Sequence, residues 1–77
     1  MKAGFDVFRV LLDKSPVWIS TADSLERAED VIKARAVINP GEYIILVQHT
    51  ATKLFYRAVW QDDSIVLTRR HIVGRGS

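Results

Sequence analysis

The chain has 77 residues, of which 48% are hydrophobic and 26% are charged, and its formal net charge is +2. This composition excludes a disordered chain, and the length leaves room for a single domain (residues 1–77) with a thin core. The mild charge does not by itself indicate a polyanion partner. The absence of cysteine excludes disulfides as a support for the core. Self-association is the support that the composition leaves open.

Two features bear on location. The longest uninterrupted apolar stretch runs from Tyr43 to Val47 and is far too short to span a bilayer. The first residues, MKAGFDVF, lack the apolar core of a secretory signal. We therefore expect a cytoplasmic protein that does not enter a membrane.

Two runs rich in β-branched and aromatic residues open the chain, on either side of the polar break at residues 13–16. They predict a hairpin with strands near residues 5–12 and 17–21. Both faces of the first strand are partly apolar. In the second run Trp18 alternates with Val17 and Ile19, and we expect it in the core in preference to a ligand-binding role.

A helix is predicted next, over the segment DSLERAEDVIKARAVI. Asp23 is expected to be its N-cap, with Glu26 reaching back in a capping-box arrangement. Acidic residues fill the first turns and basic residues the later ones, as the helix dipole favours. At about 100° per residue, one stripe of the helix is apolar. Its members are Leu25, Ala28, Val31, Ile32 and Ala36.

Pro40 and Gly41 predict the end of the helix and the turn into a strand. That strand, EYIILVQHT, is almost continuously apolar, which favours a central position in the sheet. Two further strands are predicted, LFYRAVW and IVLTRRHIV, joined by a turn at Asp62 and Asp63. Residues 74–77 are expected to form a frayed tail.

The element order is therefore strand, strand, helix, strand, strand, strand. It predicts an α+β two-layer sandwich (ββαβββ), with one helix on a mainly antiparallel sheet of four to five strands. The helix can cover only one face of this sheet, whereas the later strands carry apolar residues on both faces. The uncovered face would be a larger apolar patch than monomers usually tolerate.

The middle of the chain also carries three short motifs: Pro-x-Trp, then Ser-Leu-x-x-Ala, then Pro-Gly-Glu-Tyr. This pattern resembles a set of short uncharacterised bacterial open reading frames. The resemblance implies no activity, cofactor or catalytic residue. Its residues are Pro16, Trp18, Ser24, Leu25, Ala28, Pro40, Gly41, Glu42 and Tyr43.

The sequence contains no glycine-rich phosphate loop, nucleophile elbow or histidine cluster. His49 or His71 could pair with Asp62 or Asp63 for acid–base work, but an isolated histidine at a strand end is more often a solvated or packing residue. We therefore expect no enzyme, no cofactor and no metal site.

Two binding functions remain. The first is a protein-interaction module that binds itself as a homodimer, or another protein, through an apolar sheet face or edge, since aromatic residues and arginine are enriched at interfaces. Its candidate residues are Phe55, Tyr56 and Trp60. The alternative is a small nucleic-acid-binding or regulatory protein that uses the basic C-terminal strand, with aromatic side chains on which bases stack. Its candidate residues are Lys53, Arg57, Arg69 and Arg70.

Overall fold

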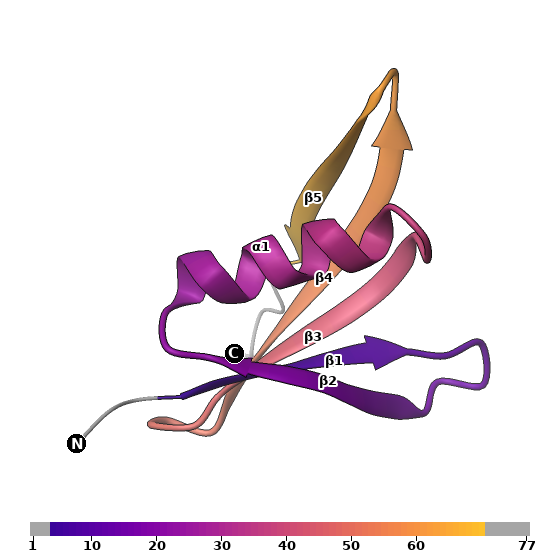
Figure 1. Cartoon of the computed structure of the whole chain (residues 1–77). Helices are drawn as coiled ribbons and strands as arrows, with labels where there is room; N and C mark the ends of the chain where they lie inside the picture. Colours follow the sequence, from indigo (N-terminus) through magenta and orange to yellow (C-terminus); the bar gives the residue numbers. More distant parts are fainter. Residues whose placement is uncertain (1–3, 71–77) are drawn as a thin grey trace.

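Five strands form one antiparallel sheet, and a single helix lies across one of its faces (Figure 1). The computed structural model describes residues 4–70, so His71 and the tail predicted over residues 74–77 lie outside the described residues. The elements are β1 (Phe5–Val10), β2 (Pro16–Ala22), α1 (Leu25–Ala36), β3 (Gly41–Val47), β4 (Thr52–Gln61) and β5 (Ser64–Arg70).

The strands are arranged in the order β2-β1-β3-β4-β5, and each is antiparallel to its neighbours. The predicted α+β class and the order ββαβββ are confirmed. β3 is the central strand, as its nearly continuous apolar sequence predicted. The tip of the β4–β5 hairpin projects beyond the helix (Figure 1). Asp62 and Asp63 form its two-residue turn, also as predicted, and Asp62 adopts a φ of 57°.

The core lies between α1 and the sheet. The apolar stripe of the helix was predicted correctly: Ala28, Ile32 and Ala36 are fully buried, and Leu25 and Val31 pack at its margin. Alanine at three core positions leaves little side-chain volume between the helix and the sheet. As a result, α1 packs on all five strands. The buried sheet residues are Val7, Tyr43, Ile45, Tyr56 and Ala58.

Two tyrosines extend this small core to its edges, where their hydroxyl groups find partners. The Tyr43 hydroxyl donates to the carbonyl oxygen of Asn39 at 2.6 Å, and the Tyr56 hydroxyl donates to Glu29 Oε2 at 2.7 Å. Each ring is therefore buried without leaving a polar atom unpaired. Burial raises the pKa of Tyr43; burial, followed by the bond to Glu29, raises the pKa of Tyr56 to about 12.

The helix begins one residue later than predicted. Ser24 is the N-cap, with φ −152° and ψ 158°, and its hydroxyl accepts a hydrogen bond from the Arg27 amide at 3.2 Å. Asp23 instead lies 3.6 Å from the Arg27 side chain as an exposed ion pair. The prediction of Asp23 as the cap was therefore wrong, because the adjacent hydroxyl occupies the capping position.

Ser24→Ala is expected to lower the free energy of unfolding by about 1 kcal/mol, because it removes the acceptor for an amide at the helix start. Asp23→Ala is the matched control and should cost less than about 0.5 kcal/mol, since exposed ion pairs contribute little. Urea denaturation of both variants checks the assignment. An equal loss in both would mean that the two residues share the cap.

The junction after the helix needs glycine for its backbone. Gly41 has a φ of 143°, a region that residues with a side chain rarely adopt. A Cβ atom at this position would meet no atom within 4 Å, so close packing is not the reason for glycine. The conformation itself sets the requirement.

The two edge strands of the sheet differ from its interior. β2 begins at Pro16, which lacks an amide proton, and its pairing with β1 is interrupted by a bulge. β5 ends in Thr68, Arg69 and Arg70, all exposed. Proline, a bulge and edge charges are all features that discourage pairing with a further strand.

Candidate protein-interaction face

The sheet face turned away from α1 carries an unbroken row of large side chains. Residues directly opposite one another in the register link four strands through Trp18, Phe8, Ile44 and Phe55, and the row ends at Arg70 on β5. Side chains of opposed residues share a face of the sheet. We call this surface the open face. It consists of the row Trp18, Phe8, Ile44, Phe55 and Arg70, with Asp6, Glu42, Leu46, Lys53 and Arg57 beside it.

Trp18 reaches this face because of the bulge between β1 and β2. Val7 is opposite Ser20 but Phe8 is opposite Trp18, so Ile19 is an extra residue on β2. Without the bulge, regular alternation would place Trp18 on the helix side with Ser20. Ile19 packs against the core instead, and Trp18 is 57% exposed. The expectation of a core Trp18 was therefore wrong.

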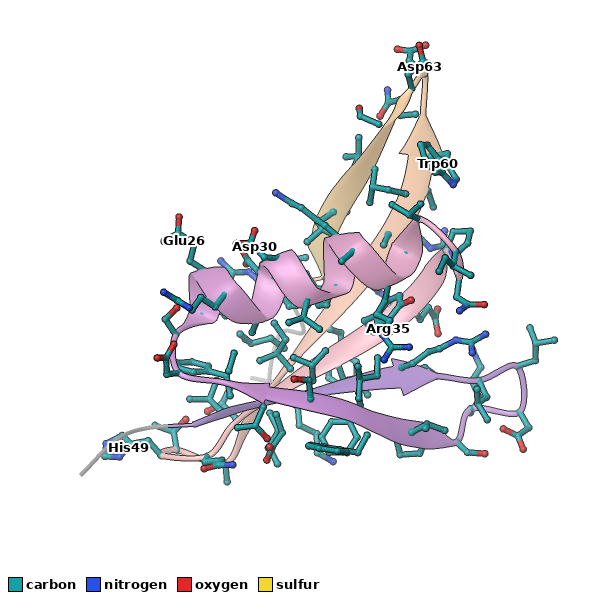
Figure 2. The ribbon with its side chains drawn as sticks, in the orientation of Figure 1. Glu26, Asp30, Arg35, His49, Trp60 and Asp63 are labelled. Carbon is teal, nitrogen blue, oxygen red and sulfur yellow. The ribbon has the colours of Figure 1, made fainter. Side chains whose placement is uncertain are left out.

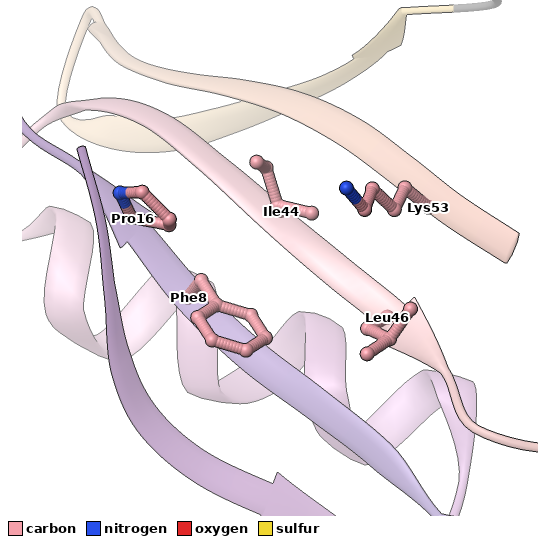
Figure 3. A pocket seen from close by; sticks show the side chains of 5 residues that line it. All are labelled: Phe8, Pro16, Ile44, Leu46 and Lys53. Atoms are coloured by element: carbon pink, nitrogen blue, oxygen red, sulfur yellow. The ribbon is translucent and has the colours of Figure 1, made fainter. Parts of the chain in front are cut away.

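A hollow of about 140 Å³ opens on this face. Figure 3 shows it from the side opposite the helix, with Phe8 and Ile44 at its centre and Lys53 reaching over it from β4. Four of its lining residues are apolar, and Lys53 is the only titratable one among them. The hollow therefore suits an apolar side chain better than a polar ligand. Its lining consists of Phe8, Pro16, Ile44, Leu46 and Lys53.

One acidic side chain is held in place at the β1 side of the open face. The Asp6 carboxylate accepts hydrogen bonds from the Thr21 hydroxyl at 2.6 Å and from the Gln48 side-chain amide at 2.9 Å. These bonds, that from Thr21 first, lower the pKa of Asp6 below its ordinary value. Asp6 is consequently a fixed negative charge at neutral pH.

A second acidic side chain lies on β3 among basic groups. Glu42 is 3.6 Å from the Lys14 ammonium group and 4.0 Å from the Arg70 guanidinium group. Arg57 is its direct cross-strand neighbour on β4. The charge of Glu42 is therefore largely balanced within the chain.

The structure separates the three predicted interface residues. Phe55 lies in the row of the open face. Tyr56 is 2% exposed in the core beneath α1, so it is not available to a partner and its place as an interface candidate is corrected. Trp60 is 48% exposed, but alternation puts it on the side opposite Phe55. Figure 2 shows it on the projecting part of β4.

Three of the four predicted nucleic-acid residues share the open face. Lys53 and Arg57 are each two residues from Phe55 on β4, and Arg70 is directly opposite Phe55. Arg69 is opposite the core residue Tyr56 and so belongs to the helix side. The basic C-terminal strand is thus divided between the two faces of the sheet.

Phe8 and Trp18 were not among the candidates from the sequence. The signal for Phe8 was its alternation with Phe5 and Val7, which places it away from a core built on Val7. No signal in the sequence marks the bulge that turns Trp18 outward.

Comparisons with family models, with curated proteins and with solved structures found no match to this chain. Within residues 4–70 no cluster of three or more histidine, aspartate or glutamate side chains is arranged to hold a metal ion. The described part of the chain also contains no helix of the length and apolarity needed to cross a membrane. The open face is therefore the feature from which a function can be argued.

Proposed function

We propose that this protein is a small non-enzymatic interaction module that binds a second copy of itself through the open face. The observation that carries the proposal is the row from Trp18 to Phe55, an aromatic and aliphatic surface across four strands that no second layer of the described chain covers. Phe8, Ile44 and Phe55 are half-buried within one chain and Trp18 is exposed, so the row forms a contiguous apolar surface of the kind that often marks an interaction site. Burying it would also support the small core, which has eight buried residues within residues 4–70.

The size of the open face is adequate for a stable complex. With strands about 4.8 Å apart and a rise of about 3.4 Å per residue, a five-stranded sheet of this length presents a flat area of roughly 500 Å². Side chains standing on it increase the accessible area. Stable interfaces bury about 800 Å² per partner, which is of the same order.

The face is a better candidate than either edge of the sheet. An edge contact would add backbone hydrogen bonds between strands of two chains, but the β2 edge has Pro16 and a bulge, and the β5 edge ends in exposed arginines. The open face has the aromatic residues and the arginine that are typical of interfaces. Association by the face is therefore favoured.

Binding of single-stranded nucleic acid is the second candidate. It is favoured by the presence of Lys53, Arg57 and Arg70 beside the aromatic row, a combination that offers phosphate contacts and stacking surfaces. Two acidic residues on the same face weaken it, since Asp6 stays ionised and Glu42 already lies near Arg70. A second copy of the chain can match these carboxylates with its own basic side chains, so self-association remains the first choice.

Phe55→Glu is expected to weaken self-association by roughly 30-fold or more, because it buries an unpaired carboxylate at the centre of the contact. Sedimentation velocity from 1 to 300 µM would measure the change in dissociation constant. Leu12→Glu is the matched control, since Leu12 is a fully exposed apolar residue in the β1–β2 turn. The Leu12→Glu variant should have the same dissociation constant for self-association as the parent.

A parent chain that stays monomeric over this whole range would overturn the proposal. In that case, fluorescence anisotropy with a labelled single-stranded oligonucleotide distinguishes the second candidate. The affinity for the oligonucleotide should fall steeply with added salt. Arg57→Ala should reduce the slope of the logarithm of affinity against the logarithm of salt concentration by about one unit.

A further inference from the structure

We infer that the second copy docks face to face about a twofold axis that runs along β3, so that Asp6 of each chain pairs with Lys53 of the other. This inference rests on the proposed self-association and adds its geometry. An isologous contact has a simple requirement: if residue i meets residue j, then j must also meet i. Every twofold axis in the plane of the open face meets this requirement, so the axes differ only in which side chains they bring together.

A twofold axis along β3 passes through the middle of the aromatic row, where Ile44 lies. Phe8 and Phe55 lie one strand to either side of Ile44, and Trp18 and Arg70 lie two strands to either side. A twofold axis along β3 brings Ile44 onto its own copy and Phe8 onto Phe55 of the second copy. It also brings the backbone position of Arg70 opposite Trp18 of the second copy, while the Arg70 guanidinium group itself lies 4.0 Å from Glu42 in each chain.

The same axis pairs opposite charges in the neighbouring row, which consists of Asp6, Leu46 and Lys53. Asp6 is opposite Leu46 on β3, and Leu46 is opposite Lys53 on β4. The same axis brings Leu46 onto its own copy and Asp6 onto Lys53 of the second copy, twice per dimer. Within one chain these two charges are kept apart by the width of β3. Across the interface each ion pair would join an aspartate already oriented by Thr21 and Gln48.

The axis also determines which side chain of the second copy faces the hollow. Phe8, Ile44 and Leu46 line it, so it is beside the axis, and the second copy's Phe55 is the side chain directed toward it. The one like-charged contact on the axis is Glu42 against itself. Lys14 and Arg70 already balance that carboxylate in each chain.

A twofold axis along the aromatic row would pair the charged side chains less favourably. It would bring Arg70 onto its own copy and Lys53 onto Arg57 of the second copy, since both lie two residues from Phe55 on β4 in opposite directions. These are like charges in a contact that excludes water, which is unfavourable.

Exchanging the charges tests the geometry. Asp6→Lys and Lys53→Asp should each weaken the homodimer about tenfold or more, because each places like charges opposite one another twice. An equimolar mixture of the two variant chains should restore a dimer as tight as the parent's to within a few fold, since both contacts in the heterodimer are then of opposite charge. Sedimentation velocity on the separate and mixed chains measures this.

A second measurement does not depend on Asp6, whose substitution removes two hydrogen bonds within the chain. The sequence has no cysteine, so single cysteines can be introduced cleanly. Ile44→Cys should be cross-linked to its own copy by a bis-maleimide of about 10 Å, the usual separation of packed sheets. Phe8→Cys should cross-link to the Phe55→Cys chain in preference to itself.

The outcomes separate the two proposals. A parent dimer whose charge variants do not recover on mixing, or whose Ile44→Cys chain does not cross-link, overturns the twofold axis along β3 and leaves self-association standing. A parent that is monomeric at all concentrations overturns both. Recovery on mixing together with self-cross-linking at position 44 establishes the geometry.

Discussion

Ile45→Ala is expected to lower the free energy of unfolding by about 2–5 kcal/mol, the usual loss when a fully buried isoleucine is truncated. Ile45 is completely buried on the central strand, between the helix and the sheet. A domain of this length has a total stability of about 4–11 kcal/mol, so the change removes a large part of it. Thermal unfolding followed by circular dichroism should show a drop of roughly 4–8 °C for each kcal/mol lost.

Ile44→Ala is the matched control on the adjacent residue. Its side chain points to the open face, so truncation removes little from the core of one chain. If the chain self-associates as proposed, the effect of this substitution on the melting temperature should grow with protein concentration, because it weakens the contact between the two chains. If Ile44→Ala were as damaging as Ile45→Ala at the lowest concentration, the two faces of β3 would not differ as described.

Alkaline pH is expected to destabilise the fold between about pH 10 and pH 12. The pKa of Tyr56 is raised to about 12, whereas a tyrosine in the unfolded chain ionises near its ordinary value of 10.0. Below pH 10 the tyrosine is neutral in both states and its contribution to stability is complete. Between pH 10 and pH 12 the unfolded chain releases a proton that the folded chain retains, so stability falls as pH rises. Above pH 12 that contribution is lost.

Tyr56→Phe separates this effect from the general consequences of high pH. The variant should lose about 1–2 kcal/mol at pH 7 through the missing hydrogen bond to Glu29, and its stability should fall less between pH 10 and pH 12. Each unit of pKa difference corresponds to about 1.4 kcal/mol of unfolding free energy. Urea denaturation at pH 7, 9, 10, 11 and 12 measures both changes. Parallel curves of stability against pH for the parent and the variant would show that Tyr56 is not the group that titrates. Tyr43, whose pKa is also raised, is present in both proteins, so its contribution cancels in the comparison.

The fold was predictable because its signals are local. Alternation along the two strands at residues 43–47 and 54–60 correctly divides their side chains into two sets, one on each face of the sheet, and the helix stripe is correct at every position. The predicted position of the helix cap was wrong by one residue, because Asp23 and Ser24 are both good capping residues and only the backbone conformation decides between them. Such boundaries depend on a few dihedral angles that the sequence leaves open.

The open face was predictable in part. An uncovered apolar face follows from one helix and strands that are apolar on both sides, and Phe55 was placed on it. Trp18 was not, because a one-residue bulge reverses the alternation on β2 and depends on the pairing with β1. Tyr56 was offered for the interface because the sequence does not show which set of alternating side chains the helix covers.

The margins of the sheet set a limit on how far association can proceed. A proline and a bulge on β2, and exposed arginines on β5, oppose the addition of strands at either side. In the proposed face-to-face pair, the open face of each chain would be covered by the other chain. The edges of the described sheet would then give little support to growth by repeated strand addition, which leads to filaments or amyloid. The proposal therefore predicts a closed dimer.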